Sequence, residues 1–188
     1  MKYIKKFENS NIELNDNHKN LTILHKLPRN LVKLECSDNK LINLPTLPKT
    51  LEYLDCSGNK LIKLPDIPDS CKKLYCYNNK LTKLPKLSQN LKIISCADNK
   101  LTELSELPES LDKLYCGENK LTTLPNLPSK LTVLSCRFNK LTELPILPET
   151  ITTLYCEGND LGYSDLDGYY DWLEINHPEV VDASKFNI

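Results

Sequence analysis

The stretch LDKLYCGENKLTTLPNLPSK, residues 111–130, decides the fold because its pattern recurs along the chain at a fixed interval. Evenly spaced cysteines mark that interval: Cys36, Cys56, Cys76, Cys96, Cys116, Cys136 and Cys156. The shared unit is L-x-x-L-x-C-x-x-N-K-L-x-x-L-P-x-L-P-x-x, which runs seven times from Leu31 to about Asp160, the last copy being incomplete. A weaker eighth copy precedes it, with matching residues at Leu14, Leu21, Leu24, Leu27 and Pro28. One such unit cannot bury its own apolar face, so the units must stack into a solenoid.

The core L-x-x-L-x-C-x-x-N-x-L resembles the leucine-rich repeat. Its L-P-x-L-P return segment is similar to the short 20-residue class found in effector proteins of enteric bacteria, and units with cysteine on the strand also resemble repeat proteins of large DNA viruses. The resemblance implies a right-handed solenoid of the α/β horseshoe class, with a parallel β-sheet on its concave face. Because proline cannot donate to a hydrogen-bond ladder, the convex return segments should be extended or polyproline-like, and the coil strongly curved or twisted.

We expect three regions along the chain: an N-terminal cap and degenerate repeat (1–30), seven repeats (31–160), and a C-terminal helical cap with an acidic tail (161–188). The segment from Tyr3 to Leu14 predicts a strand or hairpin that closes the first coil. At the other end, Ser164 and Asp167 match a capping box, and helical spacing predicts a helix from about Asp165 to Ile175 over the last coil. Trp172 then either contacts the coil or is an exposed partner anchor.

Two rows of residues are predicted to face the interior of the coil. The asparagine of each unit can hydrogen-bond the backbone of its own turn and of the neighbouring coil. The cysteine row could form disulfides, bind metal, or pack as small apolar residues. Parallel side chains in a tight coil match disulfide geometry poorly, and one thiol per coil does not make a metal site. We therefore expect eight free buried thiols, no metal, no cofactor, and a reducing compartment such as the cytoplasm, including that of a host cell.

Enzyme activity is not expected. Some bacterial proteins with similar repeats carry a ubiquitin-ligase domain whose nucleophile lies in a C-x-D motif, and this chain contains Cys36-Ser37-Asp38 and Cys96-Ala97-Asp98. Both cysteines belong to the buried row, whereas a nucleophile must be accessible and activated as a thiolate. None of the three histidines lies within the seven regular repeats, so no Cys-His pairing is evident.

Specificity must come from residues that point outward from the strands and from the turn after them. From the third unit onward one outward row alternates tyrosine with serine, so that Ser95 and Ser135 leave slots between tyrosines. Tyrosines two strands apart are about 9.6 Å apart, beyond direct aromatic pairing, and should stand as separate ridges. The candidate partner-binding residues are Tyr53, Asp55, Lys73, Tyr75, Tyr77, Lys113, Tyr115, Arg137, Phe138 and Tyr155.

These residues favour a non-catalytic module, expected to be a monomer, that binds a protein or peptide on its concave sheet face. The alternative is a structural or assembly protein that self-associates, and a threonine row offers a minor third possibility of ice or glycan binding. The net charge of -1, with only +4 over residues 1–160, argues against nucleic acid and membrane as partners. A row of lysines, one per coil, forms a second candidate edge for anionic partners: Lys40, Lys60, Lys80, Lys100, Lys120 and Lys140.

Overall fold

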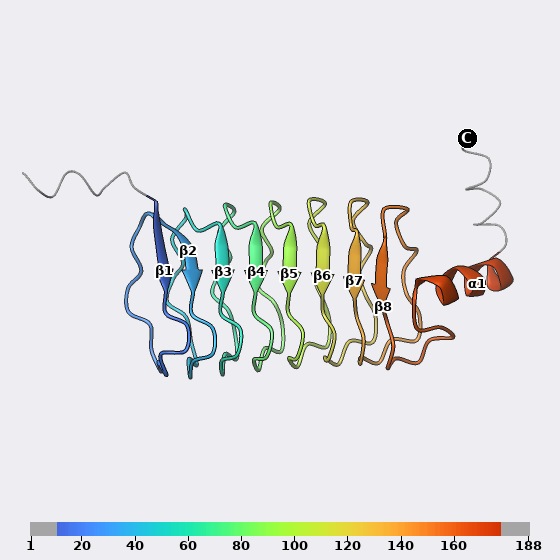
Figure 1. Cartoon of the computed structure of the whole chain (residues 1–188), viewed down its shortest axis with the longest axis horizontal. Helices are drawn as coiled ribbons and strands as arrows, with labels where there is room; N and C mark the ends of the chain where they lie inside the picture. Colours follow the sequence, from blue (N-terminus) through green and yellow to red (C-terminus); the bar gives the residue numbers. More distant parts are fainter. Residues whose placement is uncertain (1–10, 178–188) are drawn as a thin grey trace, which may run out of the picture.

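The computed structural model describes residues 11–177, in which eight short strands form one parallel sheet in sequence order. Figure 1 shows them side by side along the long axis, one per coil, which confirms the predicted solenoid. The strands are β1 (Ile12–Asn15), β2 (Leu31–Glu35), β3 (Tyr53–Asp55), β4 (Lys73–Tyr75), β5 (Ile93–Ser95), β6 (Lys113–Tyr115), β7 (Val133–Ser135) and β8 (Thr153–Tyr155).

From β2 onward, each strand pairs with the strand that lies one full repeat further along the chain, so equivalent positions of successive units lie beside one another. In β6 and β7, for example, Lys113 pairs with Val133 and Tyr115 with Ser135. Backbone hydrogen bonds continue past the strands, since the Glu118 amide donates to the Arg137 carbonyl at 2.8 Å. The repeat period therefore becomes the period of the sheet.

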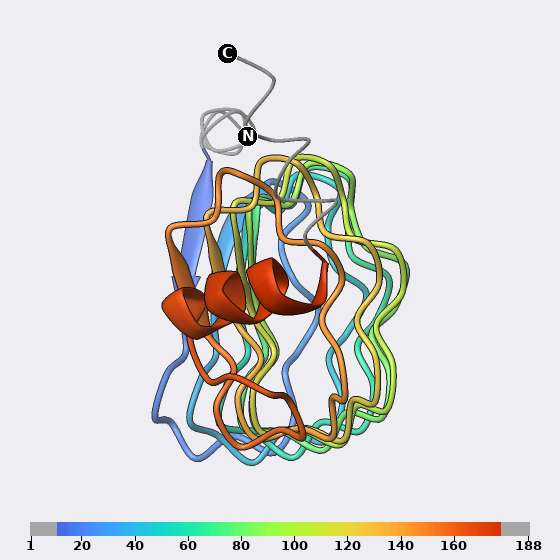
Figure 2. The same ribbon diagram turned by 90° about the vertical axis from the view of Figure 1, so that its right-hand side faces the viewer.

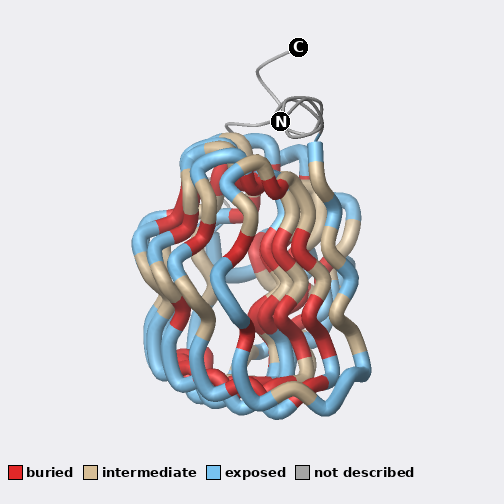
Figure 3. The backbone as a smooth tube through the Cα atoms, turned by 90° about the vertical axis from the view of Figure 1, so that its left-hand side faces the viewer, coloured by how far each residue is buried: buried red, intermediate tan, exposed pale blue. Residues whose placement is uncertain are grey.

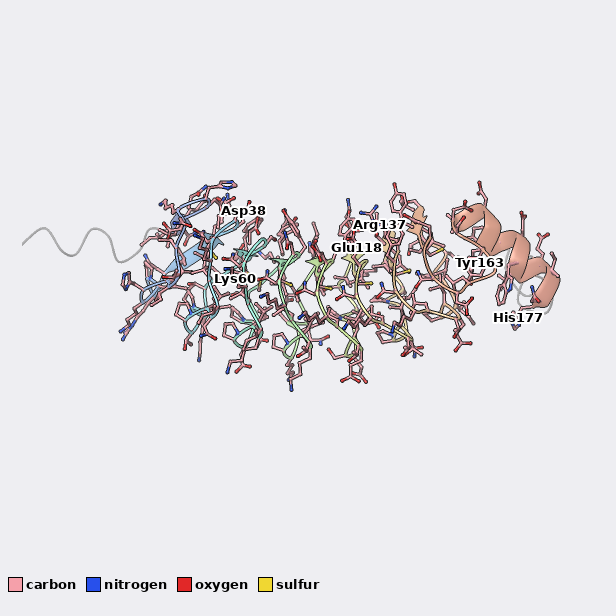
Figure 4. The ribbon with its side chains drawn as sticks, turned by 90° about the horizontal axis from the view of Figure 1, so that it is seen from below. Asp38, Lys60, Glu118, Arg137, Tyr163 and His177 are labelled. Carbon is pink, nitrogen blue, oxygen red and sulfur yellow. The ribbon has the colours of Figure 1, made fainter. Side chains whose placement is uncertain are left out.

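The core is a stack of leucine and cysteine layers inside the coil. In the unit that begins at Leu111, the side chains of Leu111, Leu114, Cys116 and Leu121 are fully buried. Figure 3 shows buried segments facing the interior along the whole stack. Within residues 11–177 the proline-rich return segments contain neither helix nor strand, as expected. The row of coils bends only gently (Figure 4), so the strong curvature or twist predicted from those segments is not seen.

The asparagine row joins every coil to its neighbour. The Nδ2 group of Asn99 donates to the carbonyls of Cys96 and Ala97 in its own coil and to that of Cys76 in the preceding one, each at 3.1 Å. Its Oδ1 accepts from the Leu81 amide of the preceding coil at 2.9 Å. The carboxamide therefore satisfies backbone groups that burial would otherwise leave unpaired, which confirms the predicted role.

A second set of side chains links coils at the end of the return segment, and sequence analysis did not identify it. The Thr50 hydroxyl donates to the Leu31 carbonyl at 2.8 Å, and the Ser110 hydroxyl donates to the Leu91 carbonyl at 2.7 Å. Hydroxyl residues of this kind bond nearby backbone wherever turns expose it. The signal was the recurrence of Ser or Thr at the last position of several units.

A helix, α1 (Leu166–Asn176), closes the C-terminal end of the stack, as Figure 2 shows. Its N-cap is Asp165, whose carboxylate accepts from the Gly168 amide at 2.9 Å, so the predicted capping box of Ser164 with Asp167 is wrong by one residue. The buried Tyr169 hydroxyl accepts from the Leu147 amide at 3.3 Å. Trp172 is half-buried with its ring 5.4 Å from that of Tyr163, so it is a cap contact and not a free anchor.

At the N-terminal end, β1 pairs in parallel with β2 and carries Ile12 and Leu14. The degenerate copy therefore contributes a strand that extends the sheet. The rest of the predicted cap, including Tyr3 and Phe7, lies outside the described residues.

All eight cysteines are free and buried, as predicted. Burial raises the pKa of the Cys96 thiol to about 12 and that of the Cys71 thiol to about 11, and it raises the pKa of the central Cys76 well above the ordinary value. The thiols are therefore protonated near neutral pH and lack the thiolate character that a nucleophile or metal ligand needs.

Replacing Asn99 with alanine should lower the free energy of unfolding by about 3 kcal/mol, because buried carbonyls and one amide lose their partners. The matched control is Asn126→Ala, since Asn126 is exposed on a return segment. It should change stability by less than about 0.5 kcal/mol. Urea denaturation followed by circular dichroism measures both, and equal midpoints for the two variants would contradict the interlocking role.

Alkaline pH should destabilise the fold through the thiols. The folded chain keeps them protonated, whereas the unfolded chain releases their protons above a pKa of about 9.0. Stability is therefore unaffected below that pH and falls above it, by up to about 1.4 kcal/mol per thiol for each pH unit. Urea midpoints at pH 8 and pH 10 test this, and a Cys96→Ala/Cys116→Ala variant should lose less stability between the two than the parent chain. Equal losses of stability between pH 8 and pH 10 in the parent and the variant would exclude the thiols as the cause.

Candidate functional site

Two outward-facing surfaces run the length of the solenoid. The sheet face consists of the third and fifth residues of each unit, such as Lys113 and Tyr115, which alternate with the buried leucine and cysteine. The rim consists of the seventh and eighth residues, such as Gly117 and Glu118, where the chain turns away from the strand. The eighth residue repeatedly adopts positive φ, including 54° at Glu118.

All ten predicted partner-binding residues lie on these two surfaces. Lys73, Arg137 and three large aromatic side chains are exposed, and Tyr77, Phe138 and Tyr155 keep 43%, 54% and 51% of their surface accessible. The sheet face carries Tyr53, Asp55, Lys73, Tyr75, Lys113, Tyr115 and Tyr155, and the rim carries Tyr77, Arg137 and Phe138. The structure thus places them on a common side of the coil, and whether they bind a partner stays a prediction.

On strands β2 to β4, side chains of the sheet face pair with one another. The Lys33 ammonium lies 3.2 Å from the Glu35 carboxylate and 5.4 Å from the Tyr53 ring centroid. The rings of Tyr53 and Tyr75 lie 5.4 Å apart, an aromatic pair on adjacent strands that sequence analysis missed because the two residues belong to different rows. Burial and, secondarily, the Asp55 carboxylate raise the pKa of Tyr53 to about 12. This aromatic pair is therefore neutral over the physiological range.

A hollow of about 430 Å³ opens on the sheet face beside this pair, and we call it the tyrosine slot. Ser95 replaces the tyrosine of the neighbouring strands, so the side chains on either side stand above it. Its lining is Tyr75, Tyr77, Ile93, Ser95, Lys113 and Tyr115. The slot predicted at Ser95 is therefore present.

Charge is divided along the sheet face. The strands β1 to β3 contribute three carboxylates, those of Glu13, Glu35 and Asp55, and one ammonium, that of Lys33. The strands β4 to β8 contribute Lys73 and Lys113 and no acidic residue at the same positions. The sheet face thus has an acidic end and a basic, aromatic end.

The rim has its own arrangement around Arg137 and Phe138. The Arg137 guanidinium lies 3.6 Å from the Glu118 carboxylate and 4.0 Å from that of Glu157. Arg137 and Glu118 lie on the same long edge of the solenoid as Asp38 (Figure 4). A Cβ added at Gly158 would collide with the Phe138 ring, so the glycine makes room for that ring against the next coil.

Other surfaces offer less specific chemistry. A hollow of about 560 Å³ lies between two return segments and is lined by residues such as Leu44, Pro65 and Asp66, and similar hollows occur between other returns. The lysine row remains exposed. Among residues 11–177 no three His, Cys, Asp or Glu side chains are grouped as a metal site would require. In the same part of the chain, no helix has the length and apolarity to cross a membrane.

Comparison with known proteins relates the fold to a protein family. The family model described as Leucine Rich Repeat matches residues 50–74. No curated protein matches the sequence.

Solved structures give broader matches. YopM from Yersinia enterocolitica WA-314 is 37% identical with a TM-score of 0.73, over 74% of this chain and 34% of its own. The functional domain of InlJ from Listeria monocytogenes, described as including a cysteine ladder, is 31% identical with a TM-score of 0.65, over 78% of this chain and 35% of its own. The chain thus spans about a third of the length of each.

The structure of a Shigella effector LRR domain matches over most of both chains. It is 30% identical with a TM-score of 0.70, and the match covers 86% of this chain and 74% of that domain. The repeated unit and the parallel sheet agree with this similarity. The chain therefore belongs to the leucine-rich repeat family.

Proposed function

We propose that the protein is a non-catalytic interaction module that holds a protein or peptide partner on its sheet face and the adjoining rim. The fold and its similarity to bacterial effector proteins support a protein-interaction module in general. Binding on the sheet face and rim in particular is supported by the conformation of Phe138.

Phe138 occupies a position that suits glycine or asparagine. Its φ is 51°, in the left-handed region that costs a bulky residue about 1–2 kcal/mol. In the other regular units the same position holds glycine, asparagine or aspartate, except for Glu118. A large aromatic side chain that is strained and also half-exposed does not contribute to folding in proportion to its size, so a role in recognition explains its presence better.

The neighbouring residues fit that role. Tyr155 is exposed on the adjacent strand, and Arg137 precedes Phe138 with ion pairs to either side that hold its guanidinium in place. Tyrosine, tryptophan and arginine are the residues that most often anchor protein interfaces. Eight buried free thiols additionally suit a reducing compartment such as the cytoplasm.

A second candidate, self-assembly, is supported by one observation. Ile42 and Ile62 occupy the same position of adjacent coils and keep 56% and 59% of their surface accessible. Exposed apolar side chains on neighbouring units can join copies of a chain. Size-exclusion chromatography over a wide concentration range separates the two candidates, because a monomer throughout would exclude assembly through these isoleucines.

The interaction proposal is tested by affinity capture from the native source, followed by mass spectrometry. A variant with Tyr75, Tyr115 and Tyr155 replaced by alanine should lose the proteins that the parent chain enriches, because its sheet face lacks three anchors. The matched control replaces Ile42, Ile62 and Ile146, exposed apolar residues outside the sheet face and rim, with alanine and should retain them. Identical captured sets for all three chains would refute binding on the sheet face.

Substitution of Phe138 should change the stability of the fold and the binding of the partner in opposite directions. Phe138→Asn relieves backbone strain and should raise the free energy of unfolding by up to about 1 kcal/mol while reducing capture of the same partner. Phe138→Tyr keeps both ring and strain, and both properties should match those of the parent. Urea denaturation and quantitative pull-down are the measurements, and an Asn variant that is less stable yet binds fully would show that Phe138 serves the fold.

A further inference from the structure

We infer that the tyrosine slot receives an acidic side chain, carried by an extended, carboxylate-rich segment of the partner protein. The inference rests on the proposed function and adds to it the chemistry of the segment that binds. It depends on three features of the sheet face: two cations without counter-ions, a gap of suitable size, and the division of charge along the strands.

One of the two cations, Lys113, lines the slot, and the other, Lys73, lies on the far side of the slot residue Ile93. Lys73 and Lys113 lie on β4 and β6, on either side of Ile93 in β5, because each pairs in register with that residue. Among the described residues, Lys33 on β2 is the one lysine of the sheet face that forms ion pairs with a carboxylate. The ammonium groups of Lys73 and Lys113 are therefore available to a carboxylate from outside.

The slot beside Lys113 has walls that suit a side chain with a polar tip. Tyr75 and Tyr115 stand on opposite sides, and the small Ser95 forms part of the floor. Burial raises the pKa of Tyr75, so its hydroxyl stays neutral and can donate a hydrogen bond to a carboxylate oxygen. An entering glutamate or aspartate would thus be met by the Lys113 ammonium and by hydroxyl donors, and Lys73, on the other side of Ile93, adds positive charge nearby.

The rest of the sheet face sets the polarity of the partner segment. Asp55 on β3, whose register neighbour is Tyr75, begins the acidic end of the face. A wholly acidic segment would be repelled there, so its carboxylates should lie over β4 to β6. Residues 165–174 carry acids on the helical cap, namely Asp165, Asp167, Asp171 and Glu174, which makes a second copy of this chain the competing occupant.

The experiment measures binding of fluorescein-labelled hexaglutamate by anisotropy at low and physiological salt, with hexaglutamine and a short oligothymidylate as comparison probes. Hexaglutamate should bind, weaken as salt rises, and exceed both other probes. Lys73→Glu/Lys113→Glu should weaken it at least about tenfold. The matched control Lys63→Glu/Lys83→Glu, with the same charge change on the return segments, should change it far less. Equal loss in both variants would reduce the effect to net charge and overturn the inference.

Filling the gap is the second arm. Ser95→Tyr introduces the residue that neighbouring strands carry at the same position, so the fold should persist by circular dichroism and urea midpoint while hexaglutamate binding falls. Ser135→Tyr makes the same change at the equivalent position of β7, away from Lys73, and should bind nearly as the parent does. Full binding by Ser95→Tyr would overturn the assignment of the slot.

The remaining outcomes are also decisive. Stronger binding of oligothymidylate than of hexaglutamate would assign the lysines to phosphate and overturn the inference. Salt-sensitive self-association that Lys73→Glu/Lys113→Glu abolishes would assign the slot to a second copy and overturn it as well. If replacing Tyr75, Tyr115 and Tyr155 with alanine abolishes capture of the partner while Lys73→Glu/Lys113→Glu keeps it, the proposed function stands and only the acidic segment is refuted.

Discussion

The structure depends on the hydrogen bonds that each buried asparagine makes to two coils at once. A coil as short as one repeat unit leaves backbone carbonyls and amides facing the interior after every strand, and water cannot reach them. The carboxamide of Asn99 offers two donors and an acceptor at that place, and it bonds both its own coil and the preceding one. Because each asparagine bonds to the neighbouring coil, these bonds form only where the strands and turns of the two coils are in register.

This constraint separates the residues that build the solenoid from those that are free to vary. Leucine, cysteine and asparagine positions are nearly uniform from unit to unit because each occupies the same buried environment. The outward positions meet no such requirement, and their composition changes from carboxylates on the first strands to tyrosine and lysine further along. A sheet face with two chemically different ends follows from that freedom, and it is suited to a partner bound in one direction.

The rim shows where the chain departs from what folding alone would favour. Its turn requires a left-handed residue in every unit, and glycine, asparagine and aspartate meet the requirement at little cost. Phe138 meets it under strain, beside a glycine that clears space for its ring. The exposed Phe138 and its neighbour Arg137, whose guanidinium lies between two carboxylates, are the rim residues that we propose take part in recognition.

The sequence by itself determined the solenoid, the parallel sheet, the buried rows and the slot at Ser95, because a strict repeat makes each residue's environment the same as that of its counterpart in the next unit. It also located the capping helix to within a residue, though Asp165 and not Ser164 caps it. Only the tertiary structure decided which side chains touch across neighbouring coils, such as the tilted ring pair of Tyr53 and Tyr75 and the packing of Phe138 against Gly158. These depend on side-chain direction and on the lateral offset of neighbouring coils, which periodicity along the chain does not specify.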